Sequence, residues 1–241
     1  VKEGQLEEAL NAFKAVSELA KDPVILEESS FQAAKLTYNS SSPFGNAMEM
    51  FKRFLVDFPQ TEHRREANEY LANLYITSKD YGRAMEAIVQ TGMGTMAMRE
   101  AYQRVAYFRA VELFQVSDWS GAQEYFNKSL GYPQNLTFVA LSHFWLGELA
   151  YRKGDAQEAL AQFESFLKTP GSYTLTERPT ALYNKAYCLY KLDRLEDASS
   201  AFRVYLQDAK KGDRKVADAT LRLADLYFLQ GKHALAEEYY R

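Results

Sequence analysis

The sequence predicts an all-α protein made of repeated helix pairs, and three observations support this. An alanine recurs at intervals of 37 to 39 residues, at Ala9, Ala47, Ala84, Ala122, Ala159, Ala198 and Ala236. The residue four positions after each alanine is aromatic in six of the seven cases, although only 14% of the chain is aromatic. Apolar residues within a copy follow helical spacing, and no segment shows the sustained alternation of a strand. This period indicates a linear stack of small units, whereas the length of 241 residues alone would suggest one or two globular domains.

Each period is predicted to be one helical hairpin, and the stretch from 140 to 170 shows the pattern best. Residues 140–152 and 159–167 both carry apolar side chains at helical spacing, and Lys153-Gly154-Asp155 between them is a turn. Pro170 follows the second helix, and proline cannot donate the next backbone hydrogen bond. In chain order the sequence predicts a partial hairpin over residues 1–22 and complete hairpins over residues 24–59, 63–92, 97–133, 137–170, 180–209 and 215–241.

The predicted core lies between the hairpins, because one hairpin cannot bury its apolar stripe alone. The rings four residues after the alanines, such as Phe163, are expected to fill the space between units. Small residues twelve positions before the alanines, such as Gly147 and Ala186, are expected to let the paired helices approach closely.

The segment from Phe144 to Asp155, followed by Ala159 and Phe163, resembles the tetratricopeptide repeat (TPR). The resemblance implies a right-handed superhelical solenoid of stacked antiparallel helix pairs, with about six to seven repeats in a single array over residues 1–241. Units that end in phrases such as residues 54–59, Phe-Leu-Val-Asp-Phe-Pro, are similar to bacterial cell-envelope TPR proteins. The Tol–Pal coordinator and the lipoprotein of the outer-membrane assembly machinery are examples, and they imply a periplasmic or cell-envelope location.

The resemblance also implies a binding surface, because the first helix of each TPR pair lines the concave face. Carried over position by position, the predicted groove consists of Tyr107, Val111, Phe144, Glu148, Tyr151, Tyr183, Tyr187, Tyr190, Leu221 and Asp225. Tyrosine combines a large rigid ring with a polar tip, which enriches it at protein interfaces. We expect Tyr107, Phe144, Tyr183 and Tyr187 to be exposed. For the rings at the twelfth repeat position, packing against the second helix remains an equal alternative, and these are Phe114, Tyr151, Tyr190 and Phe228.

The function implied by the resemblance is a non-catalytic scaffold that binds a protein or peptide segment in this aromatic-lined groove. The alternative is a module that binds glycan or peptidoglycan fragments, for which Trp119 and Trp145 are the candidate contacts. The chain begins inside a predicted second helix and carries no polar cap at either end, so we expect it to be part of a longer array.

Composition and motifs argue against other classes. The single cysteine, Cys188, excludes a disulfide framework and a multi-cysteine metal site, and no long apolar run predicts a membrane span. A net charge of −3 argues against a nucleic-acid partner. His63, His143 and His233 lie in different units, and no phosphate-binding glycine motif occurs. We therefore predict no catalytic, metal or cofactor site.

Overall fold

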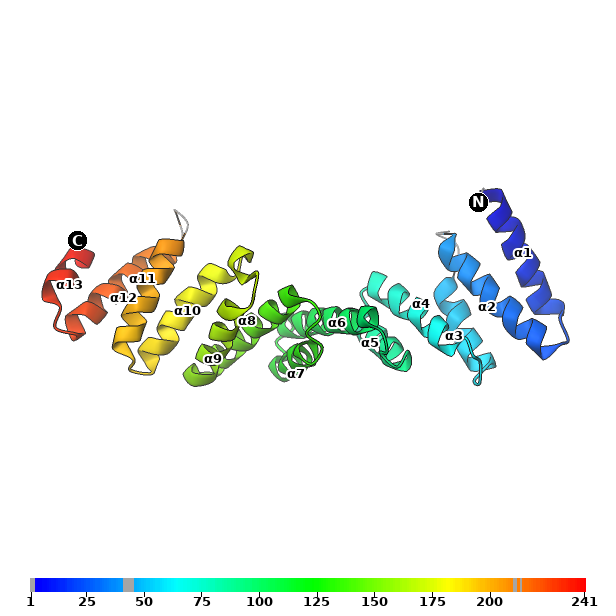
Figure 1. Ribbon diagram of the computed structural model, residues 1–241, viewed down its shortest axis with the longest axis horizontal. Helices are drawn as coiled ribbons and strands as arrows, with labels where there is room; N and C mark the ends of the chain where they lie inside the picture. The colour runs from blue at the N-terminus through cyan, green and yellow to red at the C-terminus, as the bar shows by residue number, and fades with distance from the viewer. Residues whose placement is uncertain (1–2, 41–45, 210–211, 213) are drawn as a thin grey trace. The chain divides into compact units, whose positions relative to one another are not determined.

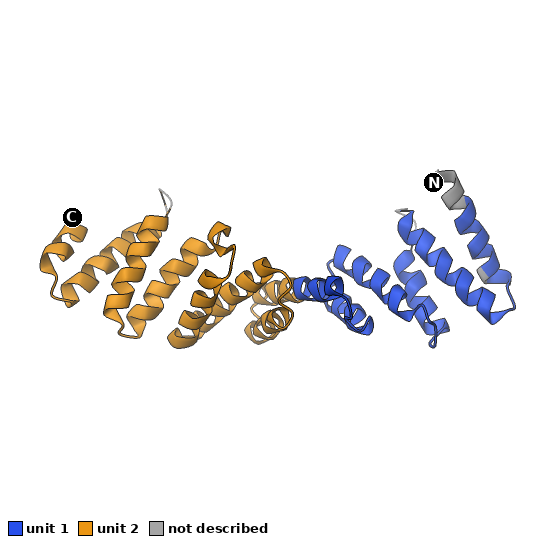
Figure 2. Cartoon of the chain, in the orientation of Figure 1, with its two compact units in different colours: residues 1–105 blue, residues 106–241 orange. Residues whose placement is uncertain are grey.

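The computed structural model describes residues 3–40, 46–209, 212 and 214–241. Within these residues the chain forms thirteen α-helices and one short 3₁₀ helix, with no strand (Figure 1). The chain divides into two compact units, residues 1–105 and 106–241 (Figure 2). The predicted all-α class is confirmed, and each unit is built of helices packed in adjacent pairs. The single array over the whole chain stays a prediction.

The first unit contains five helices and the start of a sixth. These are α1 (Glu3–Leu19), α2 (Pro23–Asn39), α3 (Ala47–Asp57), α4 (Arg64–Thr77), α5 (Tyr81–Gln90) and α6 (Met96–Gln115), which continues into the second unit. From α1 to α5, each helix packs on the next helix in the chain. The core includes Phe31, Phe51 and Phe54, which are at most 1% exposed. Phe51 is one of the predicted anchor rings, and its burial is confirmed.

The second unit continues the same arrangement. Its elements are α7 (Trp119–Leu130), α8 (Leu136–Lys153), α9 (Ala156–Lys168), the 3₁₀ helix η1 (Ser172–Thr174), α10 (Arg178–Lys191), α11 (Leu195–Asp208), α12 (Lys215–Leu229) and α13 (His233–Tyr240). From α7 to α13, each α-helix packs on its neighbours in chain order, as Figure 1 shows for α8 and α9. No helix among the described residues is both long enough and apolar enough to cross a bilayer.

The periodic residues form the core of the second unit. Ala122, Ala159 and Ala198 are fully buried, and so are the rings four residues after them, Phe126, Phe163 and Phe202. The last anchor ring, Tyr240, is 49% exposed because fewer helices cover α13 in the structure. The period therefore marks the core positions correctly, but burial at each position also depends on a neighbouring pair.

The turns inside the hairpins repeat as regularly as the core. Five residues before an anchor alanine, the backbone adopts positive φ, at Lys79, Ser117, Gly154, Asp193 and Gly231. The next amide bonds a carbonyl five residues earlier, as in Asp118 N to Leu113 O at 2.9 Å, which ends the first helix in a Schellman motif. The Asp118 side chain then accepts from Gly121 N at 2.9 Å and caps the second helix. Two adjacent residues thus end one helix and begin the next at Lys79-Asp80, Ser117-Asp118 and Gly154-Asp155, whereas Arg194 and Lys232 at the other two turns make no side-chain cap.

Replacing Ser117 by glycine is expected to stabilise the second unit by about 0.5–1 kcal/mol. Ser117 has φ 64°, where a Cβ is strained, and glycine relieves this strain at a smaller cost in chain entropy. Urea unfolding measures the change, and Gly154→Ala, which adds a Cβ at φ 84°, should destabilise the unit instead. If Ser117→Gly and Gly154→Ala changed the free energy of unfolding in the same direction, this account of the turns would be wrong.

Candidate partner-binding face

The ten predicted groove residues all lie in the second unit, on the first helices α6, α8, α10 and α12. Two of them are not at the surface, because Tyr107 is 8% and Phe144 is 5% exposed. The ring of Phe144 packs against Phe163 and Phe166 of α9, at centroid distances of 6.2 and 5.7 Å. The prediction that Phe144 is exposed is therefore wrong, since the second helix of its own pair covers the ring.

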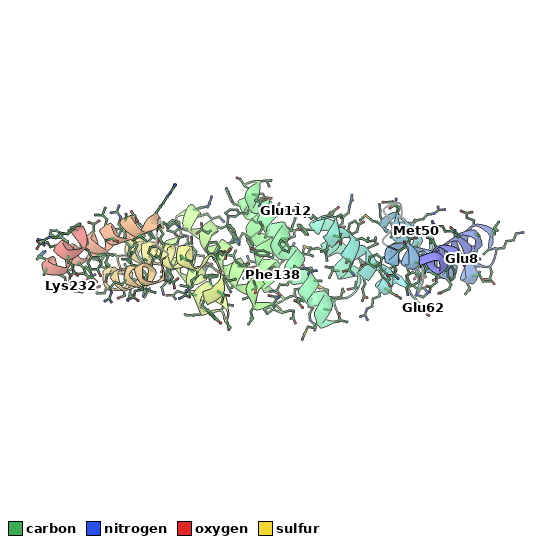
Figure 3. The ribbon with its side chains drawn as sticks, turned by 90° about the horizontal axis from the view of Figure 1, so that it is seen from above. Glu8, Met50, Glu62, Glu112, Phe138 and Lys232 are labelled. Atoms are coloured by element: carbon green, nitrogen blue, oxygen red, sulfur yellow. The ribbon has the colours of Figure 1, made fainter. Side chains whose placement is uncertain are left out.

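Tyr107 is buried by α7, the second helix of its own pair, and by α8, the first helix of the next pair. Its ring lies 5.9 Å from Phe126 and 5.2 Å from Phe138, which Figure 3 labels on α8. Its hydroxyl accepts a hydrogen bond from Trp145 Nε1 at 3.2 Å. The predicted exposure of Tyr107 is wrong for this reason. Val111, one turn further along α6, is partly buried against the same cluster.

The remaining predicted residues reach solvent to different degrees. Leu221 is 46% and Tyr190 is 36% exposed, and the neighbouring Phe228 is 56% exposed. Tyr151 is partly buried, and the Lys191 ammonium lies 4.1 Å from the centroid of its ring. Of the two readings left open for the twelfth-position rings, exposure therefore holds for Tyr190 and Phe228.

Tyr183 and Tyr187 of α10 are half-buried, and both contact one carboxylate of α12, the first helix of the next pair. Tyr183 Oη donates to Asp218 Oδ2 at 2.6 Å, and Tyr187 Oη donates to the same oxygen. Arg222 Nε donates to Tyr187 Oη at 3.2 Å and lies 3.7 Å from Asp218 Oδ1. Tyr183, Tyr187, Asp218 and Arg222 form what we call the Asp218 cluster, which ties α10 to α12.

Two further contacts extend this cluster to Asp225. Arg222 Nη1 donates to Asp225 Oδ2 at 3.0 Å, and Tyr240 Oη donates to Asp225 Oδ1 at 2.7 Å. Burial, followed by the hydrogen bond to Asp218, raises the pKa of both the Tyr183 and the Tyr187 hydroxyl. Both phenols thus stay protonated hydrogen-bond donors at neutral pH.

Glu148 is a partly buried carboxylate on α8. Asn184 Nδ2 of α10 donates to its Oε1. Burial raises the pKa of Glu148 above its usual range, and the charges of Arg152 and Lys215 with the Asn184 hydrogen bond offset part of this effect. An acid whose pKa is raised by folding holds its proton more tightly in the folded state, so its contribution to stability falls as the pH rises through the raised pKa.

Replacing Glu148 by glutamine is expected to remove this loss, because the amide stays neutral and still accepts from Asn184. The free energy of unfolding of Glu148→Gln relative to the parent chain should therefore increase between about pH 4 and pH 7. Urea unfolding at both pH values measures the difference, with Glu196→Gln on the exposed side of α11 as the matched control. If the difference in unfolding free energy between Glu148→Gln and the parent chain did not change with pH, the raised pKa of Glu148 would be contradicted.

Sequence reasoning missed Asn184, Asp218 and Arg222, the residues that pair with the predicted ones. Their signal is a separation of about one period, 35 residues from Tyr183 to Asp218 and 36 residues from Glu148 to Asn184. A search for polar residues one period apart on successive first helices would have found them.

The other candidate groups are engaged inside the fold. Cys188 is fully buried, and burial raises the pKa of its thiol to about 12, so the thiol stays protonated. Trp145 donates to Tyr107, and the Arg152 guanidinium lies over the Trp119 ring at 5.4 Å. Among the described residues, no group of three His, Cys, Asp or Glu side chains is placed to hold a metal ion.

The first unit has a polar cavity of about 280 Å³ that is open to solvent, lined by Glu62, His63, Arg65, Glu66 and Glu69. Glu62 is labelled in Figure 3. Most of the charges around this cavity are already paired. His63 Nε2 lies 3.0 Å from Glu28 Oε2, and Lys35 Nζ lies 2.8 Å from Glu66 Oε1. This histidine–carboxylate hydrogen bond and the Lys35–Glu66 ion pair connect α2 with the start of α4.

One part of the chain matches a known protein family. Residues 109–173 match the tetratricopeptide repeat family. The matched segment runs from α6 to η1 and contains Phe144 to Asp155, on which the resemblance was based. The match supports a TPR protein, and the type found in the bacterial cell envelope stays a prediction. No relative with a curated description matches the sequence.

Several solved structures are similar to the chain at low sequence identity. The TPR protein YrrB, described as having an unusual peptide-binding site, is 16% identical, with 80% of this chain and 89% of that chain covered and a TM-score of 0.49. BtubC from P. vanneervenii is 13% identical, with 88% and 87% covered and a TM-score of 0.48. MamA from Desulfovibrio magneticus RS-1 is 13% identical, with 73% and 91% covered and a TM-score of 0.45.

Proposed function

We propose that this protein is a non-catalytic scaffold that binds a segment of a partner protein on the first-helix face of its second unit. We define this partner-binding face by Tyr151, Tyr187, Tyr190, Leu221, Asp225 and Phe228. The observation that carries the proposal is the exposure of Tyr190, Leu221 and Phe228, at 36%, 46% and 56%, beside the Asp218 cluster. Exposed apolar side chains that gather around fixed polar groups are typical of protein interfaces.

The TPR match in residues 109–173 supports a scaffold, because repeat arrays offer extended surfaces built from successive first helices. Tyr107 and Phe144 take a structural part in this proposal, since they are buried and hold α6 and α8 in place. Val111 and Glu148 are partly buried and border the face. The partner-binding face is thus smaller than the predicted groove and lies mainly on α10 and α12.

Site-specific photocross-linking in the cells that produce the protein tests this proposal. A photoreactive phenylalanine replaces Tyr190 on the face, and in a second protein it replaces Val204, which is 45% exposed on the second helix α11. We expect a discrete cross-linked protein from position 190 and none from position 204. The same products from both positions, or none from position 190, would contradict the proposed face.

The bacterial cell envelope remains part of the proposal as the location, and cell fractionation tests it. The glycan-binding alternative has no contact in its favour, because Trp119 and Trp145 are engaged with Arg152 and Tyr107. Titration of the tryptophan fluorescence with peptidoglycan fragments separates the two functions, and an unchanged signal is expected.

A further inference from the structure

We propose that Glu148 of α8 binds a basic side chain of the partner segment, a lysine or an arginine, at the border of the partner-binding face. This inference rests on the proposed function and names the chemistry that the face selects. Glu148 lies one turn before Tyr151, which belongs to the face, and both side chains are partly exposed. Helix α8 lies inside the second unit, with further helices before and after it, so Glu148 is exposed although the neighbouring pairs are present.

The carboxylate of Glu148 is only half satisfied within the chain. Asn184 Nδ2 of α10 donates a hydrogen bond to Oε1. Among the described residues, no group donates to the second oxygen, Oε2, and the protein does not enclose this atom. Oε2 can therefore accept a hydrogen bond from a donor that reaches the face.

Two cations near Glu148 are held by other groups. Arg152 lies four residues after Glu148, at the spacing at which glutamate–arginine pairs form along a helix, but its guanidinium lies over the Phe114 ring, 5.1 Å from the centroid. Lys215 Nζ of α12 lies over the Tyr183 ring, 4.9 Å from the centroid. Both cations act on Glu148 through their charge, without a hydrogen bond to it, and they favour its ionised form. Glu148 therefore offers the face a carboxylate that these two cations do not contact.

The other carboxylates on the described first helices of this unit each contact an arginine. Asp218 and Asp225 of α12 lie 3.7 and 3.0 Å from nitrogens of Arg222. Glu112 of α6 lies 3.1 Å from the Nη1 of an arginine one turn earlier. A basic side chain of the partner would give Glu148 the contact that these three carboxylates already have.

The next pair shows that a guanidinium fits at this place in the repeat. Tyr187 stands one repeat after Glu148. Arg222 stands one repeat after Asn184, and its Nε donates to Tyr187 Oη at 3.2 Å. At Glu148 the same contact comes from a neutral asparagine, so the negative charge of this side chain is left without a cation from the next pair.

A carboxylate at this position also lowers the stability of the fold. Burial raises the pKa of Glu148, whereas a glutamine there would accept from Asn184 without this loss. Ionisable side chains that lower stability are typical of functional sites, where they recognise a ligand. A role in recognition therefore predicts that Glu148→Gln is more stable at neutral pH but binds the partner more weakly.

A library of random peptides of about 12 residues, displayed on phage, provides the probe. Selection runs in parallel on the full chain and on its Glu148→Gln variant, and the peptides enriched only on the parent chain are synthesised. Fluorescence anisotropy measures their binding, with and without replacement of a basic residue by glutamine. Glu196→Gln, on the exposed side of α11, serves as the matched control for loss of one carboxylate.

We expect these peptides to share a lysine or an arginine at one position. Its replacement by glutamine should weaken binding to the parent chain by about tenfold or more, and should change binding to Glu148→Gln by less than about twofold. Glu196→Gln should bind like the parent chain, and raising the salt from about 0.05 to 0.5 M should weaken binding to the parent chain.

The inference is wrong if no peptide distinguishes the parent chain from Glu148→Gln, or if the peptides that do so share no basic residue. Cross-linking at position 190 tests the partner-binding face by itself. A discrete cross-linked protein at position 190 would therefore keep the proposed function even if Glu148 selected no basic residue.

Discussion

Truncating Phe163 to alanine is expected to destabilise the second unit by about 3–5 kcal/mol. The ring is fully buried and belongs to the largest core cluster of this unit. It lies between the two helices of the α8–α9 pair, 6.2 Å from the Phe144 ring. Alanine removes the buried ring and leaves a cavity that the neighbouring rings cannot fill without leaving their own contacts.

Urea unfolding measures the loss, and hydrogen exchange shows where it occurs. Protection of backbone amides should fall first in α8 and α9, because repeat units depend on their own pair and its neighbours. Val204→Ala removes a side chain that is 45% exposed and should change the stability by less than about 0.5 kcal/mol. If Phe163→Ala unfolded at the same urea concentration as the parent chain, the placement of Phe163 in the core would be wrong.

Enlarging Gly147 to leucine is expected to be the next most damaging change, with a net loss of about 2 kcal/mol or more. A Cβ placed on Gly147 would lie 2.8 Å from Cε1 and 2.9 Å from Cδ1 of Phe163, closer than carbon atoms pack. The Phe163 ring is fully buried and has no free space into which to move. The resulting strain exceeds the gain of about 1 kcal/mol from replacing a glycine inside a helix.

A double-mutant cycle connects the two predictions. With Phe163→Ala in place, the Gly147→Leu side chain can occupy the space of the missing ring, so the double variant should be less destabilised than the sum of the single variants. Gly147→Ala serves as the intermediate step, because it adds the Cβ alone. Additive losses in the double variant would show that Gly147 and Phe163 do not oppose each other as the structure indicates.

The turns and the core positions could be predicted because each depends on a few nearby residues. Gly154 and Asp155 end one helix and begin the next, by positive φ at Gly154 and by the Asp155 carboxylate accepting from Glu158 N at 3.0 Å. Such signals lie within one or two turns of the chain. The anchor rings could be predicted because they repeat with a period, and a stack of similar pairs buries similar positions.

The partner-binding face was harder to predict, because its exposure depends on side chains from other helices. Phe144 and Tyr183 occupy the same repeat position, yet Phe144 is 5% exposed and Tyr183 is half-buried with its hydroxyl on Asp218. Both rings pack on the second helix of their own pair, Phe144 at 5.7 Å from Phe166 of α9 and Tyr183 at 5.4 Å from Tyr205 of α11. Only the tyrosine carries a hydroxyl, which it directs to Asp218 of the next pair. Repeat position alone does not distinguish these two environments.

The residue pattern of the chain was enough to predict the all-α class, the paired helices, the turns between them and the rings of the core. Which aromatic residues meet solvent, and how their polar groups are paired, depends on the packing of one helix pair against the next. Tyr183 and Tyr187 find Asp218 at separations of 35 and 31 residues, across the boundary between two helix pairs. The physical reason is that helix formation depends on spacing along one segment, whereas burial and hydrogen bonding of a side chain depend on the surface that the next pair brings against it.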